Sequence, residues 1–289
     1  MLDKRGGPIS GQPNWSAGFM PSMFQGTLFR PSGNPILDLQ GPSHLDAVAQ
    51  RHQLDLLAQL NQKHLDERPG GRELAARIET YELAYRMQSE APDTVDLSKE
   101  TQGTRDLYGI GKQPTDEYGR NCLIARRLVE RGVRFIQLYS GGGHLEDTWD
   151  GHESIEKNHG LHGAEVDQPI AALLTDLERR GLLESTLVVW GGEFGRMPFS
   201  EGRDAPGRNH NPYGFSMWMA GGGVKGGMGF GETDEFGFQA MVDKTHVHDI
   251  HATILHLMGI DHEALAYCHQ GRQETLTDVH GRVIREICA

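Results

Sequence analysis

Two polar loops hold most of the side chains in this chain that could do chemistry. The first follows Tyr139 and reads SGGGHLEDTWDGHESIEKNHG, and the second follows Trp190 and contains GGEFGRMPF and GRNHNPYGF. The first loop supplies carboxylates and imidazoles; the second adds a glutamate, arginines, an asparagine and a histidine. Zinc and other divalent cations bind such carboxylates and imidazoles, and arginine neutralises anions. The two loops together predict a metal site that faces an anionic ligand.

The candidate residues follow from these side-chain types. The candidate metal ligands are Asp147, Asp150, His152, His159, Glu193 and His210. The candidate catalytic residues are Arg196, Arg208 and Asn209. The expected cofactor is a divalent metal, zinc first, with calcium, magnesium or manganese as alternatives. A histidine taken singly is more often a solvated residue than a ligand, so the prediction depends on the two loops meeting.

For the loops to meet, the strands before them must lie in one sheet. Apolar runs predict strands at 133–139, 186–190 and 214–220, with an amphipathic helix at 162–181 between the first two. This α/β alternation predicts a mixed, largely parallel sheet between helix layers. Ligand-binding loops of such sheets converge beyond the carboxyl ends of the strands, which would place Glu193 at a strand tip.

The rest of the chain divides into parts of different composition. Residues 1–42 are predicted to be an extended or irregular lead-in, and residues 43–114 a helical hairpin with a polar linker. Residues 115–289 form the predicted α/β core, in one domain with 43–114. Ser43 and Thr115 are the predicted N-caps of the first and third helices.

A histidine-rich stretch, HVHDIHATILH, lies outside both polar loops. It predicts a helix at about 249–258, with Asp249 as the N-cap. His248 and His251 are three residues apart and therefore close on one helix face, but the stretch lacks the His-Glu-x-x-His pattern of zinc enzymes. We expect a helix that packs into the core.

Composition limits the class of partner. The chain has 289 residues, a net charge of −12, 38 glycines and 15 histidines. A negative chain lacks the basic surface that nucleic acid requires, so no nucleic-acid partner is expected. No apolar run approaches the roughly 20 residues that cross a bilayer, and the start, MLDKRGGPIS, lacks an export-signal pattern. No membrane span is expected.

Several long motifs in order carry a family resemblance. They are GRNCLIARRLVERGVRFIQLY, WDGH, DQPIAALLTDLERRGLLESTLVVWGGEFGR, GRNHNPYGF, AGGGVKGG and HDIHATILHLMGIDH. From about residue 115 onward the chain resembles the sulfatase-like family catalogued as domain of unknown function 1501, within the alkaline phosphatase superfamily. The resemblance implies a twisted, largely parallel sheet between helix layers, and a metal centre that hydrolyses phosphate or sulfate esters.

The resemblance also implies a ligand set. It places ligands on Asp150 and His152, with Asp147 as the competing carboxylate, and on Glu193 and His210. Phe194 stands where phosphatase relatives carry a second histidine ligand. Asn209 stands where family members usually carry an aspartate.

In the superfamily the nucleophile lies on a first strand upstream of everything seen here, behind an export signal. We therefore expect an N-terminally truncated chain: the C-terminal and larger part of a periplasmic hydrolase of phosphate or sulfate esters. Its substrate would be a small anionic ester or a sulfated or phosphorylated glycan. The alternative is a non-catalytic remnant or binding module that keeps the fold and a structural metal and binds a glycan or a protein.

Overall fold

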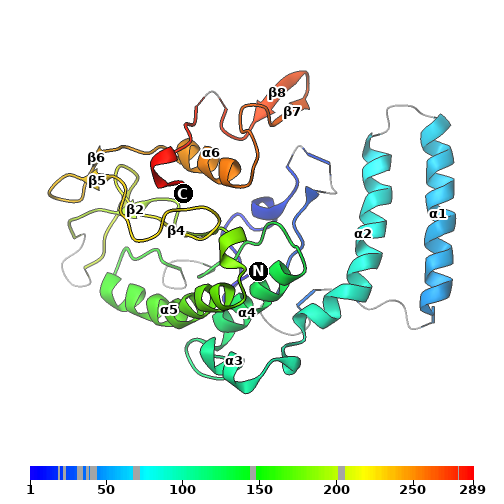
Figure 1. The fold of residues 1–289 in the computed structure, drawn as a ribbon, viewed down its shortest axis with the longest axis horizontal. Coiled ribbons are helices and arrows are strands. Elements are labelled where there is room, and N and C mark those ends of the chain that lie inside the picture. The colour runs from blue at the N-terminus through cyan, green and yellow to red at the C-terminus, as the bar shows by residue number, and fades with distance from the viewer. Residues whose placement is uncertain are drawn as a thin grey trace. The chain divides into compact units, whose positions relative to one another are not determined.

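The computed structural model describes residues 1–18, 20–21, 24–30, 35–36, 39, 44–67, 72–143, 148–200, 206–278 and 280–289. The chain is a mixed α/β protein that divides into two compact units, Met1–Gly143 and His144–Ala289. Figure 1 shows the elements of both units. Ser43, the predicted first N-cap, lies outside the described residues.

The first unit is helical. Its elements are η1 (Gln12–Trp15), α1 (Ala47–Glu67), α2 (Arg72–Val95), η3 (Leu97–Lys99), α3 (Gln102–Leu107) and α4 (Asp116–Glu130). The predicted hairpin is confirmed as α1 and α2, which lie side by side. Polar contacts join the two helices, because Arg51 pairs with Glu82 at 2.6 Å and stacks on the Tyr85 ring at 4.9 Å. The expected polar linker is partly wrong, since α2 continues to Val95 and α3 follows.

Helix α4 forms much of the core of the first unit. Cys122 on this helix is fully buried. Ile136 and Leu138 pack against the cluster of Met1, Ile124 and Ala125. This is the alternation expected of a strand, but residues 133–139 contain no strand. The prediction of a strand at 133–139 is therefore wrong, although alternate side chains of this segment do pack on the core.

The second unit contains α5 (Ile155–Arg179), η5 (Leu183–Ser185), α6 (Val247–Leu257), η6 (Arg285–Ile287) and all the strands found among the described residues. The strands are β1 (Val188–Trp190), β2 (Gly195–Arg196), β3 (His210–Asn211), β4 (Trp218–Ala220), β5 (Glu232–Thr233), β6 (Ala240–Val242), β7 (Ala266–His269) and β8 (Arg272–Thr275). The amphipathic face predicted for α5 is confirmed, because Val166, Leu173 and Leu177 are buried.

The expected largely parallel sheet is not observed among the described residues. The strands form four two-stranded antiparallel pairs: β1 with β4, β2 with β3, β5 with β6, and β7 with β8. Two predicted strands are present in shortened form as β1 and β4. They pair with each other, with Trp190 opposite Trp218, because the chain between them folds back through β2 and β3.

Within the part of the chain that the structure describes, no helix has the length and apolar character needed to cross a bilayer.

Candidate metal centre

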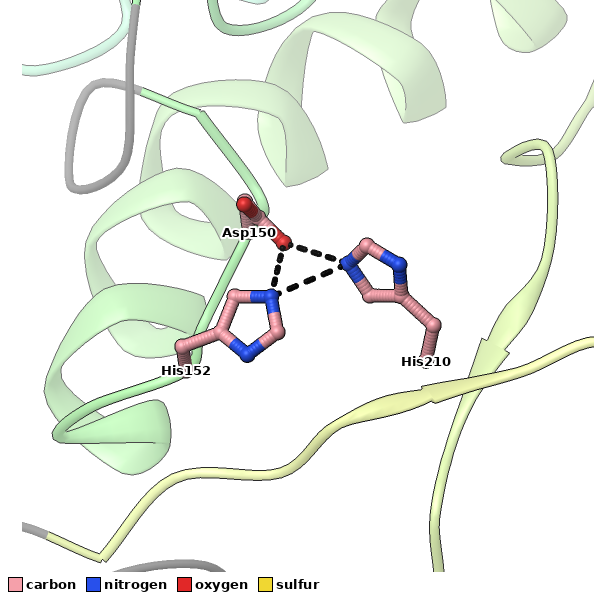
Figure 2. Close-up of side chains that lie close together, drawn as sticks. All are labelled: Asp150, His152 and His210. Atoms are coloured by element: carbon pink, nitrogen blue, oxygen red, sulfur yellow. Dashed lines mark hydrogen bonds and ion pairs between the residues drawn. The ribbon is translucent and has the colours of Figure 1, made fainter.

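Three predicted ligands converge in the second unit. Asp150 Oδ1 lies 2.9 Å from His210 Nε2 and 3.1 Å from His152 Nε2, and the two imidazole nitrogens are 3.1 Å apart. Figure 2 shows Asp150 and His152 on the loop before α5 and His210 on β3, with all three side chains pointing toward one another. The three are a group of possible metal ligands, with donor atoms within 4.8 Å of one another.

The spacing of these donor atoms fits one cation. Donors that share a tetrahedral zinc ion at roughly 2.0–2.1 Å lie about 3.3 Å from one another. The three observed separations of 2.9, 3.1 and 3.1 Å are slightly shorter than this. Two imidazoles and a carboxylate suit zinc and several other first-row ions, so the donor set does not determine which metal binds.

Local hydrogen bonds fix the loop that carries Asp150 and His152. Thr148 Oγ1 accepts from the backbone N–H of Asp150 at 3.0 Å, and the carbonyl of Thr148 accepts from the side chain of Asn158 on α5 at 2.9 Å. The backbone N–H of His152 donates to the carbonyl of Asp150 at 2.8 Å. The loop therefore turns tightly against the start of α5 and presents both side chains on one side.

A short hairpin, β2 with β3, carries the other half of the site. Its register places Arg196 opposite His210. The side-chain oxygen of Asn209 accepts from the backbone N–H of His210 at 2.7 Å, and the carbonyl of Asn209 accepts from Met197 N–H at 2.9 Å. The register, together with these bonds, directs Arg196 and His210 to the same carboxylate.

A close backbone approach joins the loop to the hairpin. Arg208 N–H donates to the carbonyl of Gly151 at 3.0 Å. Gly207 is buried, and a Cβ atom there would lie 1.8 Å from the carbonyl oxygen of His152 and 2.4 Å from the nitrogen of Glu153. Only glycine fits at this distance, since the atoms in the way belong to backbone.

Arg196 supplies the positive charge beside the three ligands. Its Nη2 donates to Asp150 Oδ1 at 2.7 Å and to the carbonyl of Trp149 at 3.0 Å, and its Nη1 donates to the carbonyl of Arg208 at 3.2 Å. Burial alone would raise the pKa of Asp150, but hydrogen bonds from His210 and Arg196 outweigh burial and hold this pKa below its ordinary value. Asp150 is therefore a carboxylate at neutral pH.

The other predicted residues lie apart from the three ligands or support them. Arg208 donates through Nη1 to the carbonyl of Met197 at 3.0 Å. Glu193 is exposed and is not part of the group, because the chain turns back after β1 and brings Arg196 inward instead. His159 packs on the Trp149 ring, with centroids 5.4 Å apart, and its pKa is lowered by burial and then by the charge of Arg196. Asp147 lies outside the described residues.

Three residues that support the site were not predicted. Trp149 accepts from Arg196 through its carbonyl, and its ring also contacts His162 with centroids 5.2 Å apart. The Phe194 ring lies 4.1 Å from the His210 ring. Asn211 is fully buried and its side chain bonds three backbone groups, in Tyr213, Gly214 and Phe238. The only signal for them in the sequence was their position next to predicted ligands.

Fold and site together define a mixed α/β protein whose second unit brings together a carboxylate and two imidazoles that could hold a metal ion. The chain belongs to the family described as "Protein of unknown function (DUF1501)", whose model matches residues 1–288. The match also covers the first 114 residues, which carried little of the resemblance in sequence. Comparison with curated proteins and comparison with solved structures each gave no match.

Proposed function

We propose that this protein is a metal-dependent hydrolase of phosphate or sulfate esters, related to alkaline phosphatases and sulfatases. The convergence of Asp150, His152 and His210 beside Arg196 carries the proposal. The relation to that superfamily is part of the proposal and is based on the motif resemblance. Zinc is the first expected metal, and the expected substrate is a small anionic ester or a sulfated or phosphorylated glycan.

The chain's own residues have separate roles in this proposal. Asp150, His152 and His210 hold the cation, which when bound supplies Lewis acidity to ester hydrolysis. Arg196 is the candidate for binding the anionic group, because its side chain is largely buried, at 17% exposure, and its guanidinium is already fixed in direction by hydrogen bonds. Asn209 positions His210 through its backbone N–H, so it is a positioning residue.

One observation favours the alternative, a binding module with a structural cation. A guanidinium has five N–H donors. Arg196 donates three of these N–H groups to partners among the described residues, in Asp150, Trp149 and Arg208. Two donors remain for a substrate, so Arg196 has less capacity for an oxyanion than a fully open arginine.

The test is hydrolysis of p-nitrophenyl phosphate and p-nitrophenyl sulfate by the metal-free protein after addition of zinc, manganese, magnesium or calcium. Matched variants are His210→Ala and His256→Ala, since His256 is an exposed histidine on α6. We expect turnover that depends on added metal, is lost in His210→Ala and is kept in His256→Ala. Metal uptake without turnover would favour the binding module, and no metal uptake would refute both.

A further inference from the structure

Three other imidazoles gather in the second unit, at the start of α6. The ring centroids of His246 and His248 are 4.9 Å apart, those of His248 and His280 are 5.9 Å apart, and those of His246 and His280 are 6.2 Å apart. Two imidazoles bound to one zinc ion have centroids about 5 Å apart, from the metal–nitrogen distance and tetrahedral geometry. His152 and His210 at the first site are separated by a similar 4.8 Å.

The C-terminal segment brings His280 to this position. Arg282 N–H donates to Asp249 Oδ1 at 2.8 Å. Gly281 has a φ of +99°, and a Cβ atom there would lie 2.9 Å from the carbonyl oxygen of His248. His280 is thus held beside α6 by the two residues that follow it, although it lies 31 positions after Asp249 in the chain.

Among the described residues, no carboxylate forms a hydrogen bond or ion pair with a ring nitrogen of these three histidines. Both oxygens of Asp249 accept from backbone N–H groups, those of His246 and Arg282, so the predicted N-cap is instead the N3 residue of a capping box. His246 Nδ1 accepts from His248 N–H at 3.3 Å, which leaves Nε2 available. His248 Nδ1 is buried without a hydrogen-bond partner among the described residues.

A cavity of about 590 Å³ is lined by two of the three histidines, His246 and His280, and by Asp249, Glu263, Asp278 and Arg282, among others. Three carboxylates against one guanidinium give its wall a net negative charge, which attracts a cation. A set of imidazoles selects zinc, copper or nickel over calcium and magnesium.

We propose that His246, His248 and His280 form a second binding site, for a first-row transition metal ion. In the structure the rings of His246 and His248 stack at 22°, and the nitrogens do not converge as closely as those of the first site. Binding therefore requires rotation of a ring about its Cβ–Cγ bond, a torsion with a broad energy profile. The bound ion ties the C-terminal segment to the start of α6. This site goes beyond the proposed hydrolase and does not depend on it.

The test is calorimetric titration of the metal-free full chain with zinc chloride, with metal content measured by mass spectrometry after gel filtration. The variants are His280→Gln and His248→Gln at the second site, the double variant His152→Gln with His210→Gln at the first, and His256→Gln as the exposed control on α6. Circular dichroism with a chelator present checks that each variant is folded.

We expect two zinc equivalents for the wild type and for His256→Gln, and one for each of the other variants. Loss of a direct ligand weakens zinc binding by more than the roughly 10- to 100-fold typical of an outer-shell change. A His280→Gln or His248→Gln protein that binds as much zinc as the wild type overturns the second site. The second site is also overturned if the wild type binds one zinc equivalent and only the double variant loses it. In that case the first site stands. If His280→Gln and His248→Gln lose a zinc equivalent and the double variant does not, the second site stands and the first site is contradicted.

Discussion

Replacing Gly207 with alanine is expected to separate the two halves of the metal centre. The added Cβ would lie 1.8 Å from the carbonyl oxygen of His152, whereas ordinary van der Waals contact begins at 3.4 Å. The backbone around His152 or around Gly207 must therefore move by about 1.6 Å, the difference between these two distances. Because a metal site holds its bond lengths within about 0.2 Å, a shift of this size displaces His152 from the ligand position.

The expected effects are on metal affinity and on stability. Zinc affinity, measured by titration, should fall by at least about 100-fold, the upper end of what an outer-shell change costs. Forcing an atom into a packed site typically costs about 1–3 kcal/mol of unfolding free energy. For a unit of roughly 150 residues, each kcal/mol lowers the melting temperature by about 2–4 °C.

The matched control is Gly163→Ala. Gly163 lies within α5, and a Cβ atom there would meet nothing within 4 Å. Alanine should stabilise this helix by roughly 0.5–1 kcal/mol and leave zinc binding unchanged. A Gly207→Ala protein with the zinc affinity and melting temperature of the wild type would show that the loop and the hairpin do not approach each other this closely, and the account of the site would fail.

Two further predictions concern the surroundings of the two sites. Asn211→Ala removes three hydrogen bonds from a fully buried side chain, and should lower the unfolding free energy by about 2–4 kcal/mol in denaturant titrations; a loss below about 0.5 kcal/mol would contradict the assignment. Burial alone would raise the pKa of Asp249, but backbone N–H groups of His246 and Arg282 hold it below its ordinary value. This carboxylate therefore stabilises the fold above its unfolded pKa, about 3.9, and the contribution is lost as pH falls through the lower folded pKa. Asp249→Asn should be less stable than the wild type at pH 7 and equally stable in strong acid, and a pH-independent difference would refute this.

The helices were predictable because their signals are local. Val166, Leu173 and Leu177 repeat at helical spacing, and the structure buries all three in α5. A periodic face requires only that one side of the element meets a core, whichever segment provides it. Helix ends were less predictable, since Asp249 is the N3 residue in the first turn of α6 and the N-cap is His246.

Strand pairing could not be read from apolar runs. The run at 186–190 and the run at 214–220 both predicted strands, and β1 and β4 lie within them. Nothing in either run says that the two strands are neighbours, or that they run in opposite directions. Pairing depends on the path of the chain between the strands, and two-residue strands such as β2 and β3 are too short to show an alternating pattern.

The site shows the same division between local and non-local information. Asp150 and His152 share one short loop, and their Asp-x-His spacing was visible in the sequence. His210 joins them only because β2 pairs with β3 in a register that sets it opposite Arg196. A slip of one residue would turn His210 to the other face of the hairpin and remove it from the group. Glu193 had the right residue type and the right position after a strand. It lies outside the group because it falls in the exposed turn between β1 and β2, and β2 then brings Arg196 to the site.

The contacts of Arg196 decide how the first site can act. Asp150 is both a possible metal ligand and the ion-pair partner of this arginine, through the same Oδ1 atom. A cation on that oxygen competes with the guanidinium for its lone pairs, because both are positive and both need the same acceptor. Metal binding would thus weaken the Arg196–Asp150 pair and free an N–H donor next to the cation. The carbonyls of Trp149 and Arg208 would still hold the guanidinium in place. Arg196 would then have three N–H donors for an anion, one more than the two left by its present hydrogen bonds. The metal-bound site would therefore bind an anion better than the present contacts of Arg196 indicate.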